Sequence, residues 1–407
     1  MLAVLEADRA RVLEITHQII QLQRAIAALR DEQVAAQQRL DSYIYPVLTL
    51  PNEITSEIFV HFLPPEPGLP EVNSRLSPTR LTHVCRKWRA VAVATPALWK
   101  GLRVIVPPSL GRDLKGLASL ADMCLQRSGY CPLSIEFYGS MGNTDRDDNL
   151  LSTLLSYPKR LQYLKLDLCP PQSLPQIDSP MALLQSLELI LFLESQLDEI
   201  ASWNMPKLRD VMLSNEASLK AVLPWGQLTS LSFHRINPNL CLPVLRKTSN
   251  LLFCTLNFTG RIYMAYTGSG IINLPALTSL VIRMDGGENF ATGILTDLVV
   301  PALQQLEVPE SLLGRDPINL LTSFISKSGC TLRRLFITSR QMHKHKVKVK
   351  DEQYRAACPS VVDFSSMADF LFTFDPTDSD DSGAEDSDRE ELSDSENDSG
   401  DSGSGSE

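Results

Sequence analysis

The chain lacks the patterns that mark secreted and membrane proteins. Its eight cysteines are scattered and form no Cys-x-x-Cys pair, a distribution that favours reduced thiols over a disulfide framework. No run of about 18 apolar residues is present, so no transmembrane helix is expected. Glu6, Asp8 and Arg9 near the start argue against a secretory signal peptide. We therefore expect an intracellular protein, cytoplasmic or nuclear, with no membrane partner.

Catalytic motifs are also missing. The sequence contains no Gly-x-Gly-x-x-Gly, Gly-x-Ser-x-Gly or His-Glu-x-x-His pattern. Only His343 and His345 are close together, and no third metal ligand lies near them. They begin a basic run, 343–350, that is typical of a charged edge strand or loop; nuclear import, a nucleic-acid patch and a dock for an acidic segment are the alternatives. We expect no enzyme, no cofactor, no metal site and no nucleic-acid partner.

The net charge of −10 is unevenly distributed. Residues 375–407 contain 14 acidic residues and one basic residue, Arg389, so the rest of the chain carries about +3. This segment is rich in Ser and Gly, and its one large apolar residue is Leu392. Such a composition cannot bury enough apolar surface to offset the entropy lost on ordering. It predicts a disordered acidic tail.

Residues 5–40 predict one long helix. Val12, Ile19 and Ile26 share one heptad position, and the other apolar position is occupied by Ile15, Leu22 and Leu29. β-Branched residues at the first position and mainly Leu at the second favour a parallel two-stranded coiled coil. The pattern weakens at Gln33 and Ala36. A homodimer through this helix and a helix folded back on its own chain both fit the sequence.

Two shorter helices are predicted between residues 50 and 91. In the first, Pro51 suits the first turn, and apolar residues recur every fourth position on one face, at Leu50, Ile54, Ile58 and Phe62. Pro64 and Pro65 end it. In the second, Ser77 is the expected N-cap and Pro78 the first residue. Its apolar stripe is Leu81, Val84, Trp88 and Val91, whereas Arg86, Lys87 and Arg89 are expected in solvent.

These residues resemble the F-box, and closely its fungal F-box-like type. The resemblance covers residues 46–102 and rests on three motifs in order: Leu50, Pro51, Glu53 and Ile54; Val84, Cys85 and Trp88; Thr95, Pro96, Leu98 and Trp99. The Pro-rich insert 64–78 is longer than a minimal F-box connection. The resemblance implies docking to the Skp-type adaptor of a cullin–RING ubiquitin ligase. The implied adaptor-facing or adaptor-supporting positions are Leu50, Pro51, Ile54, Ile58, Leu81, Val84, Cys85 and Trp88; filling a small helical core is the alternative role.

The middle of the chain is a repeat array. The pattern Leu-x-x-Leu-x-Leu recurs eight times at intervals of 20 to 29 residues, the period range of leucine-rich repeats. Each motif predicts a short strand whose alternate residues enter a core shared with neighbouring repeats. A helix at 114–125 and a strand at 133–137 form an atypical first repeat. The motifs begin at Leu161, Leu184, Leu208, Leu228, Leu251, Leu277, Leu303 and Leu332. The Asn or Cys that normally follows them is present only as Cys169.

In a leucine-rich-repeat horseshoe, the residues between and just after the strand leucines face the concave side. Their mixed size and charge are typical of a protein-binding surface. The predicted substrate-binding positions are Lys165, Glu188, Met212, Ser232, His234, Thr255, Asn257, Arg283, Glu307 and Phe336.

Together these patterns predict an α/β protein: a helical F-box followed by a leucine-rich-repeat solenoid, preceded by a long helix and followed by a disordered tail. The predicted domains are 1–42 (amphipathic helix), 43–106 (F-box-like), 107–374 (degenerate repeats) and 375–407 (acidic tail). The predicted function is substrate recognition in an SCF-type cullin–RING ubiquitin ligase, with an unknown protein substrate. A non-ligase repeat scaffold and an acidic-tailed nuclear protein that binds basic partners are the alternatives.

Overall fold

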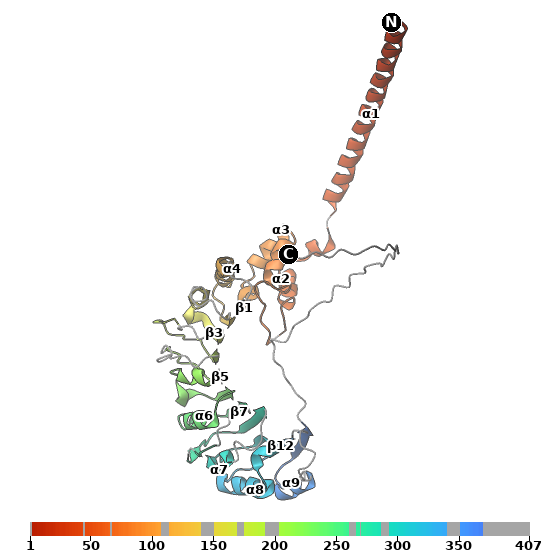
Figure 1. Ribbon diagram of the computed structural model, residues 1–407. Coiled ribbons are helices and arrows are strands. Elements are labelled where there is room, and N and C mark those ends of the chain that lie inside the picture. Colours follow the sequence, from red (N-terminus) through yellow and green to blue (C-terminus); the bar gives the residue numbers. More distant parts are fainter. Residues whose placement is uncertain are drawn as a thin grey trace, which may run out of the picture. The chain divides into compact units, whose positions relative to one another are not determined.

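The computed structural model describes eleven stretches of the chain (Figure 1). They are residues 2–43, 45–65, 67–106, 114–139, 150–168, 175–191, 203–259, 266–268, 270–285, 293–339 and 351–368. The predicted acidic tail 375–407, the basic run 343–350 and Cys169 lie outside the described residues.

The predicted N-terminal helix is confirmed. Helix α1 runs from Leu2 to Ser42, and none of its described residues is buried. A turn of 3-10 helix, η1 (Pro46–Thr49), follows it. None of the helices in the described part of the chain is long and apolar enough to cross a membrane.

Residues 46–99 form a small helical segment. It comprises α2 (Asn52–His61), η2 (Pro78–His83), α3 (Arg86–Val93) and η3 (Pro96–Trp99). The single second helix predicted from residue 77 is therefore wrong, because Cys85 has extended backbone geometry and separates η2 from α3. The N–H of Trp88 donates to Cys85 Sγ at 3.4 Å, so this cysteine caps α3. Ser77 caps η2 as predicted.

The core of this segment forms where its helices meet. Phe59, Leu81, Val91, Leu98 and Trp99 are buried. The Trp99 indole N–H is satisfied by the Ala92 carbonyl at 2.9 Å. Tertiary burial of these large side chains is what holds such short helices, which would be marginal in isolation.

An eleven-stranded parallel sheet occupies the middle of the chain. Each of the eight Leu-x-x-Leu-x-Leu motifs overlaps one of its strands, as predicted, whereas β1 and β13 were not predicted. In spatial order the strands are β1 (Gly101–Ile105), β2 (Leu133–Tyr138), β3 (Leu161–Leu168), β4 (Ser186–Leu191), β5 (Asp210–Ser214), β6 (Ser230–His234), β7 (Phe253–Thr259), β9 (Ser279–Asp285), β11 (Gln305–Pro309), β12 (Arg334–Ser339) and β13 (Asp363–Ala368). Strands β8 (Ile272–Asn273) and β10 (Leu298–Val299) form a separate parallel pair.

One face of the large sheet is the core. The three apolar positions of every motif are at most 3% exposed. Apolar residues of the connecting helices belong to the same cluster, and Figure 1 shows α4, α6, α7 and α8 along one side of the sheet. We call the opposite face, which carries the intervening residues, the open face. The connecting helices are α4 (Leu114–Arg127), α6 (Pro238–Leu245), α7 (Ile294–Asp297), α8 (Pro317–Ser328) and α9 (Asp351–Ala357). The connecting 3-10 turns are η4 (Pro158–Arg160), η5 (Glu216–Lys220), η6 (Trp225–Gln227) and η7 (Glu310–Leu313).

The Pro-rich insert covers the outer edge of β1. The Arg103 N–H donates to the Pro70 carbonyl at 2.9 Å, and the Val72 N–H donates to the Arg103 carbonyl at 3.0 Å. Leu69 approaches Gly101 so closely that a Cβ on this glycine would lie 3.1 Å from Leu69 Cδ2. An uncovered edge strand is a site for unwanted pairing, so the insert protects β1 and ties the helical segment to the sheet.

Candidate interaction surfaces

Helix α2 has apolar side chains on two faces. Thr55 and Phe59 point into the core and are buried, and the Phe59 and Trp88 rings meet edge to face with centroids 5.0 Å apart. Ile54 and Ile58, one turn apart, are 51% and 50% exposed. Residues four apart lie on the same side of a helix. We call these two residues the exposed isoleucine pair.

The other predicted adaptor positions divide between surface and core. Pro51 is exposed and Leu50 is half-buried, so both adjoin the start of α2 at the surface. Val84 is 60% exposed, whereas Leu81 is buried. Cys85 and Trp88 are half-buried. Leu81 and Trp88 therefore support the surface from within.

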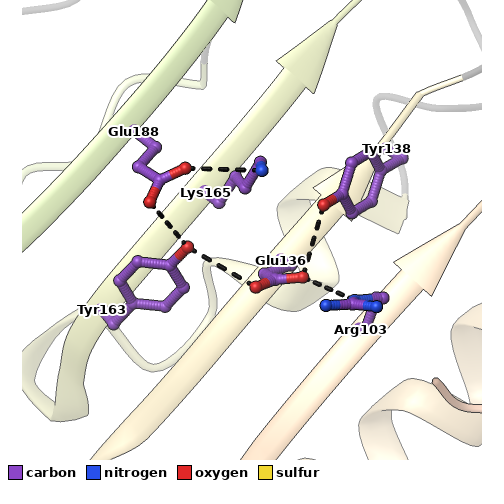
Figure 2. Close-up of polar contacts among 6 residues, drawn as sticks. All are labelled: Arg103, Glu136, Tyr138, Tyr163, Lys165 and Glu188. Atoms are coloured by element: carbon purple, nitrogen blue, oxygen red, sulfur yellow. Dashed lines mark hydrogen bonds and ion pairs between the residues drawn. The ribbon is translucent and has the colours of Figure 1, made fainter. Parts of the chain in front are cut away.

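An alternating row of charges crosses the first four strands on the open face. Arg103, Glu136, Lys165 and Glu188 are register neighbours on β1, β2, β3 and β4. Arg103 Nε lies 2.6 Å from Glu136 Oε2, and Lys165 Nζ lies 3.4 Å from Glu188 Oε2 (Figure 2). Glu136 is only 5% exposed. Burial of a charge is costly unless it is paired, and here each charge has an opposite neighbour.

Two tyrosines join the ion pairs into one network. Tyr163 Oη lies 3.0 Å from Glu188 Oε1 and 3.5 Å from Glu136 Oε1. Tyr138 Oη lies 3.4 Å from Glu136 Oε2, and Lys165 Nζ sits 5.3 Å from the centre of the Tyr138 ring. Figure 2 shows all six side chains converging between the strands. We call Arg103, Glu136, Tyr138, Tyr163, Lys165 and Glu188 the six-residue polar network.

The protonation states in the network follow from its burial and charges. Burial raises the pKa of Tyr163, and the nearby Glu188 and Glu136 carboxylates raise it further. Burial and then Glu136 raise the pKa of Tyr138. Burial lowers the pKa of Lys165, but Glu188 and Tyr138 raise it by more, so its pKa lies above the ordinary value. Both phenols therefore remain hydrogen-bond donors and Lys165 remains a cation at neutral pH.

Replacing Tyr163 with Phe should reduce the loss of stability in alkali. Below about pH 10, the ordinary tyrosine pKa, Tyr163 is protonated in both the folded and the unfolded state. Above it the unfolded state ionises first, because the folded pKa is raised, and the free energy of unfolding falls by about 1 kcal/mol per pH unit. Tyr163→Phe removes this term. Denaturant titrations from pH 8 to 11 measure it.

The control for this experiment is Tyr130→Phe, because the side chain of Tyr130 is fully exposed. It should follow the wild-type profile. Parallel profiles for Tyr163→Phe and the wild type would contradict the raised pKa.

The remaining predicted substrate positions also lie on the open face. Met212, Ser232 and Thr255 continue the row on β5, β6 and β7, and with Val281 they make a stretch without charge. Further along the row Glu307 and Phe336 are register neighbours, and Arg283 Nε pairs with Glu307 Oε1 at 2.8 Å. His234, Asn257 and Arg283 occupy the next row. The ten predicted positions thus share one face of the sheet. Two pairs of them form ion pairs with each other: Lys165 with Glu188, and Arg283 with Glu307.

Sequence reasoning missed four of the six residues of the polar network. Arg103, Glu136, Tyr138 and Tyr163 were not among the predicted surface residues. Glu136 does lie between buried Ile135 and Phe137, the same alternation that identified Lys165 and Glu188. Among the described residues no group of three or more His, Cys, Asp or Glu side chains could hold a metal ion.

One known protein family matches the part of the chain that contains the helical segment. The F-box-like family model matches residues 47–104. This segment is an F-box-like domain. No curated protein matches the chain. F-box domains typically bind Skp-type adaptors and suggest a substrate-recognition role in ubiquitin ligases.

Lys87 holds the start of the F-box-like domain in place. Its Nζ donates to the carbonyls of Leu48 and Leu50 at 2.7 Å each. Arg89 Nε likewise donates to the Thr82 carbonyl at 2.7 Å. The prediction that Lys87 stays in solvent is therefore wrong, whereas Arg86 and Arg89 are exposed as expected. The partners of Lys87 lie 37 and 39 residues away, and no local pattern reports such contacts.

Proposed function

We propose that this protein is the substrate-recognition subunit of an SCF-type cullin–RING ubiquitin ligase. The F-box-like domain docks on the Skp-type adaptor, and the parallel sheet is a leucine-rich-repeat solenoid whose open face binds the protein substrate. The chain itself is not an enzyme; ubiquitin transfer belongs to its partner subunits. The exposed isoleucine pair, in a domain of this family, is the observation that carries the proposal.

Adaptor docking is supported by the double-sided character of α2. Its inner face already buries Thr55 and Phe59, so Ile54 and Ile58 are not needed to close the domain's own core. Removing an apolar side chain from water contributes about 1.5–3 kcal/mol when burial is complete, and both isoleucines are only half covered. Binding of a separate subunit that covers the exposed half of each isoleucine would add most of the remaining burial free energy to the affinity.

Substrate binding is supported by the regular order of the open face. Neighbouring strands lie about 4.8 Å apart, and the register places one side chain of each in a common row. In the stretch from Met212 to Val281 these side chains are half-buried, uncharged and of moderate size. A protein segment can cross such a row without removing any charge from water.

Affinity purification of the full chain from its own cells, read by mass spectrometry, tests this function. The proposal predicts recovery of the Skp-type adaptor, the cullin and the RING subunit. Proteins bound through the open face should accumulate when the proteasome is inhibited. Recovery of other bound proteins without any ligase subunit would favour the non-ligase scaffold instead.

Lys87→Met should weaken adaptor binding about 10-fold. The variant removes two hydrogen bonds from a charged donor, each worth about 1.5–3 kcal/mol in general, and thereby frees Leu50 to move. Part of that loss falls on folding and part on docking, which leaves roughly 1.4 kcal/mol, or one factor of ten, in affinity. Isothermal titration calorimetry with the purified adaptor measures it.

The matched control is Arg86→Met, which removes the same charge from the neighbouring exposed residue. It should bind like the wild type. Equal affinities for both variants would show that Lys87 does not position the docking surface.

A further inference from the structure

Helix α1 exposes an unusual amount of apolar surface. Thirteen of its Leu, Ile and Val side chains are exposed, from 40% at Ile15 to 80% at Leu2. The side-chain hydrogen bonds described for it stay within the helix, as between Arg11 and Glu14 or Gln37 and Asp41. Nothing among the described residues covers it. An exposed helix with this much apolar surface is typical of a helix that packs against a partner.

The apolar residues of α1 follow a heptad. Val12, Ile19 and Ile26 occupy the first core position, and Ile15, Leu22 and Leu29 the second, and all six are exposed. β-Branched residues at the first position with mainly Leu at the second suit a parallel two-stranded coiled coil. The occupant with the matching stripe is therefore a second copy of the same helix.

Gln33 supplies the register. It falls at the first core position, one heptad after Ile26. In a parallel pair without stagger the two Gln33 side chains face each other and can share a hydrogen bond. A parallel pair staggered by one heptad would instead set Gln33 against Ile26 or Leu40 and leave its amide beside an apolar side chain. The flanking pairs across such an interface contain no like charges: Arg11 with Thr16, Gln18 with Gln23, Ala25 with Arg30, and Glu32 with Gln37.

We infer that two copies of this chain associate through α1 as a parallel, in-register coiled coil. Each copy then brings its own F-box-like domain and its own sheet into one assembly. The inference rests on α1 alone, which precedes the matched residues 47–104, and does not depend on the proposed ligase role.

Light scattering of the full chain and two neighbouring variants tests the interface. The wild type at high micromolar concentration should show twice the 45.2 kDa mass of one chain. Ile19→Asp, at the core position, should give the mass of one chain. Ile20→Asp is the matched control, because Ile20 is the same residue type with a similar exposure (41% against 47%) but lies beside the seam; it should stay a dimer.

A monomeric wild type, a mass of three or more chains, or equal effects of the two variants would overturn the inference. Both variants should bind the Skp-type adaptor like the wild type, because α1 lies outside the F-box-like domain. A failed dimer with intact adaptor binding would therefore refute this inference and leave the proposed function standing.

Oxidation of Gln33→Cys tests the orientation. In the parallel in-register pair the two introduced cysteines face each other, and a disulfide should give a covalent dimer on a non-reducing gel. In an antiparallel pair centred on the same seam they would lie on the order of 30 Å apart, and no such dimer would form. The wild type, oxidised in parallel, controls for the native cysteines.

Discussion

Ile58→Asp should weaken binding of the Skp-type adaptor by at least about 100-fold. Ile58 is half exposed on α2 and belongs to the exposed isoleucine pair. An aspartate placed at the centre of an apolar interface loses the buried side chain and leaves an unpaired charge, which costs about 3 kcal/mol or more. Titration calorimetry with the purified adaptor measures the change.

The control for this variant must separate docking from folding. Ile271→Asp makes the same change at another exposed isoleucine (68%, against 50% for Ile58) outside the F-box-like domain, and it should bind the adaptor normally. Both variants should melt within a few degrees of the wild type, since neither residue is in the core. Unchanged affinity of Ile58→Asp would show that α2 does not present the docking surface.

Glu136→Ala should lower the free energy of unfolding by about 3 kcal/mol. The substitution leaves Arg103, whose side chain is only 25% exposed, without its ionic partner. It also removes an acceptor for Tyr138 and Tyr163. Denaturant titration at neutral pH measures the loss.

Glu307→Ala is the matched control, because its partner Arg283 is 58% exposed. An ion pair at the surface is worth about 1 kcal/mol or less, so the control should be only slightly destabilised. Combining Arg103→Met with Glu136→Met should recover part of the loss, since no charge is then left unpaired. Equal losses for Glu136→Ala and Glu307→Ala would mean that the polar network does not stabilise the sheet.

The strands were predictable because their signal is local. In each Leu-x-x-Leu-x-Leu motif, three residues within six positions fill the same core. The motif that begins at Leu161 was sufficient to predict strand β3. Strand β1 carries no such motif. It is held by backbone hydrogen bonds to the Pro70–Val72 segment and by pairing with β2, contacts between residues about 30 apart. Sequence spacing does not encode them.

The candidate site divides in the same way. Helical spacing alone placed Ile54 and Ile58 on one face of α2, and the structure confirms that they share an exposed face. The spacing does not tell which face is inside; Phe59, next in the chain, is the residue that packs on Trp88. The hydrogen bonds of Lys87 form only in the folded domain, with residues distant in the sequence. For this reason the sequence predicted an exposed lysine, whereas the structure shows one that holds the segment before α2.

Hydrogen exchange of the full chain, with and without the purified Skp-type adaptor, tests the central claim most directly. Docking removes water from α2 and suppresses its local opening. The account predicts added protection in Asn52–His61 and around Val84 and Cys85, with the sheet unchanged. No added protection at saturating adaptor, or protection confined to the strands, would contradict it.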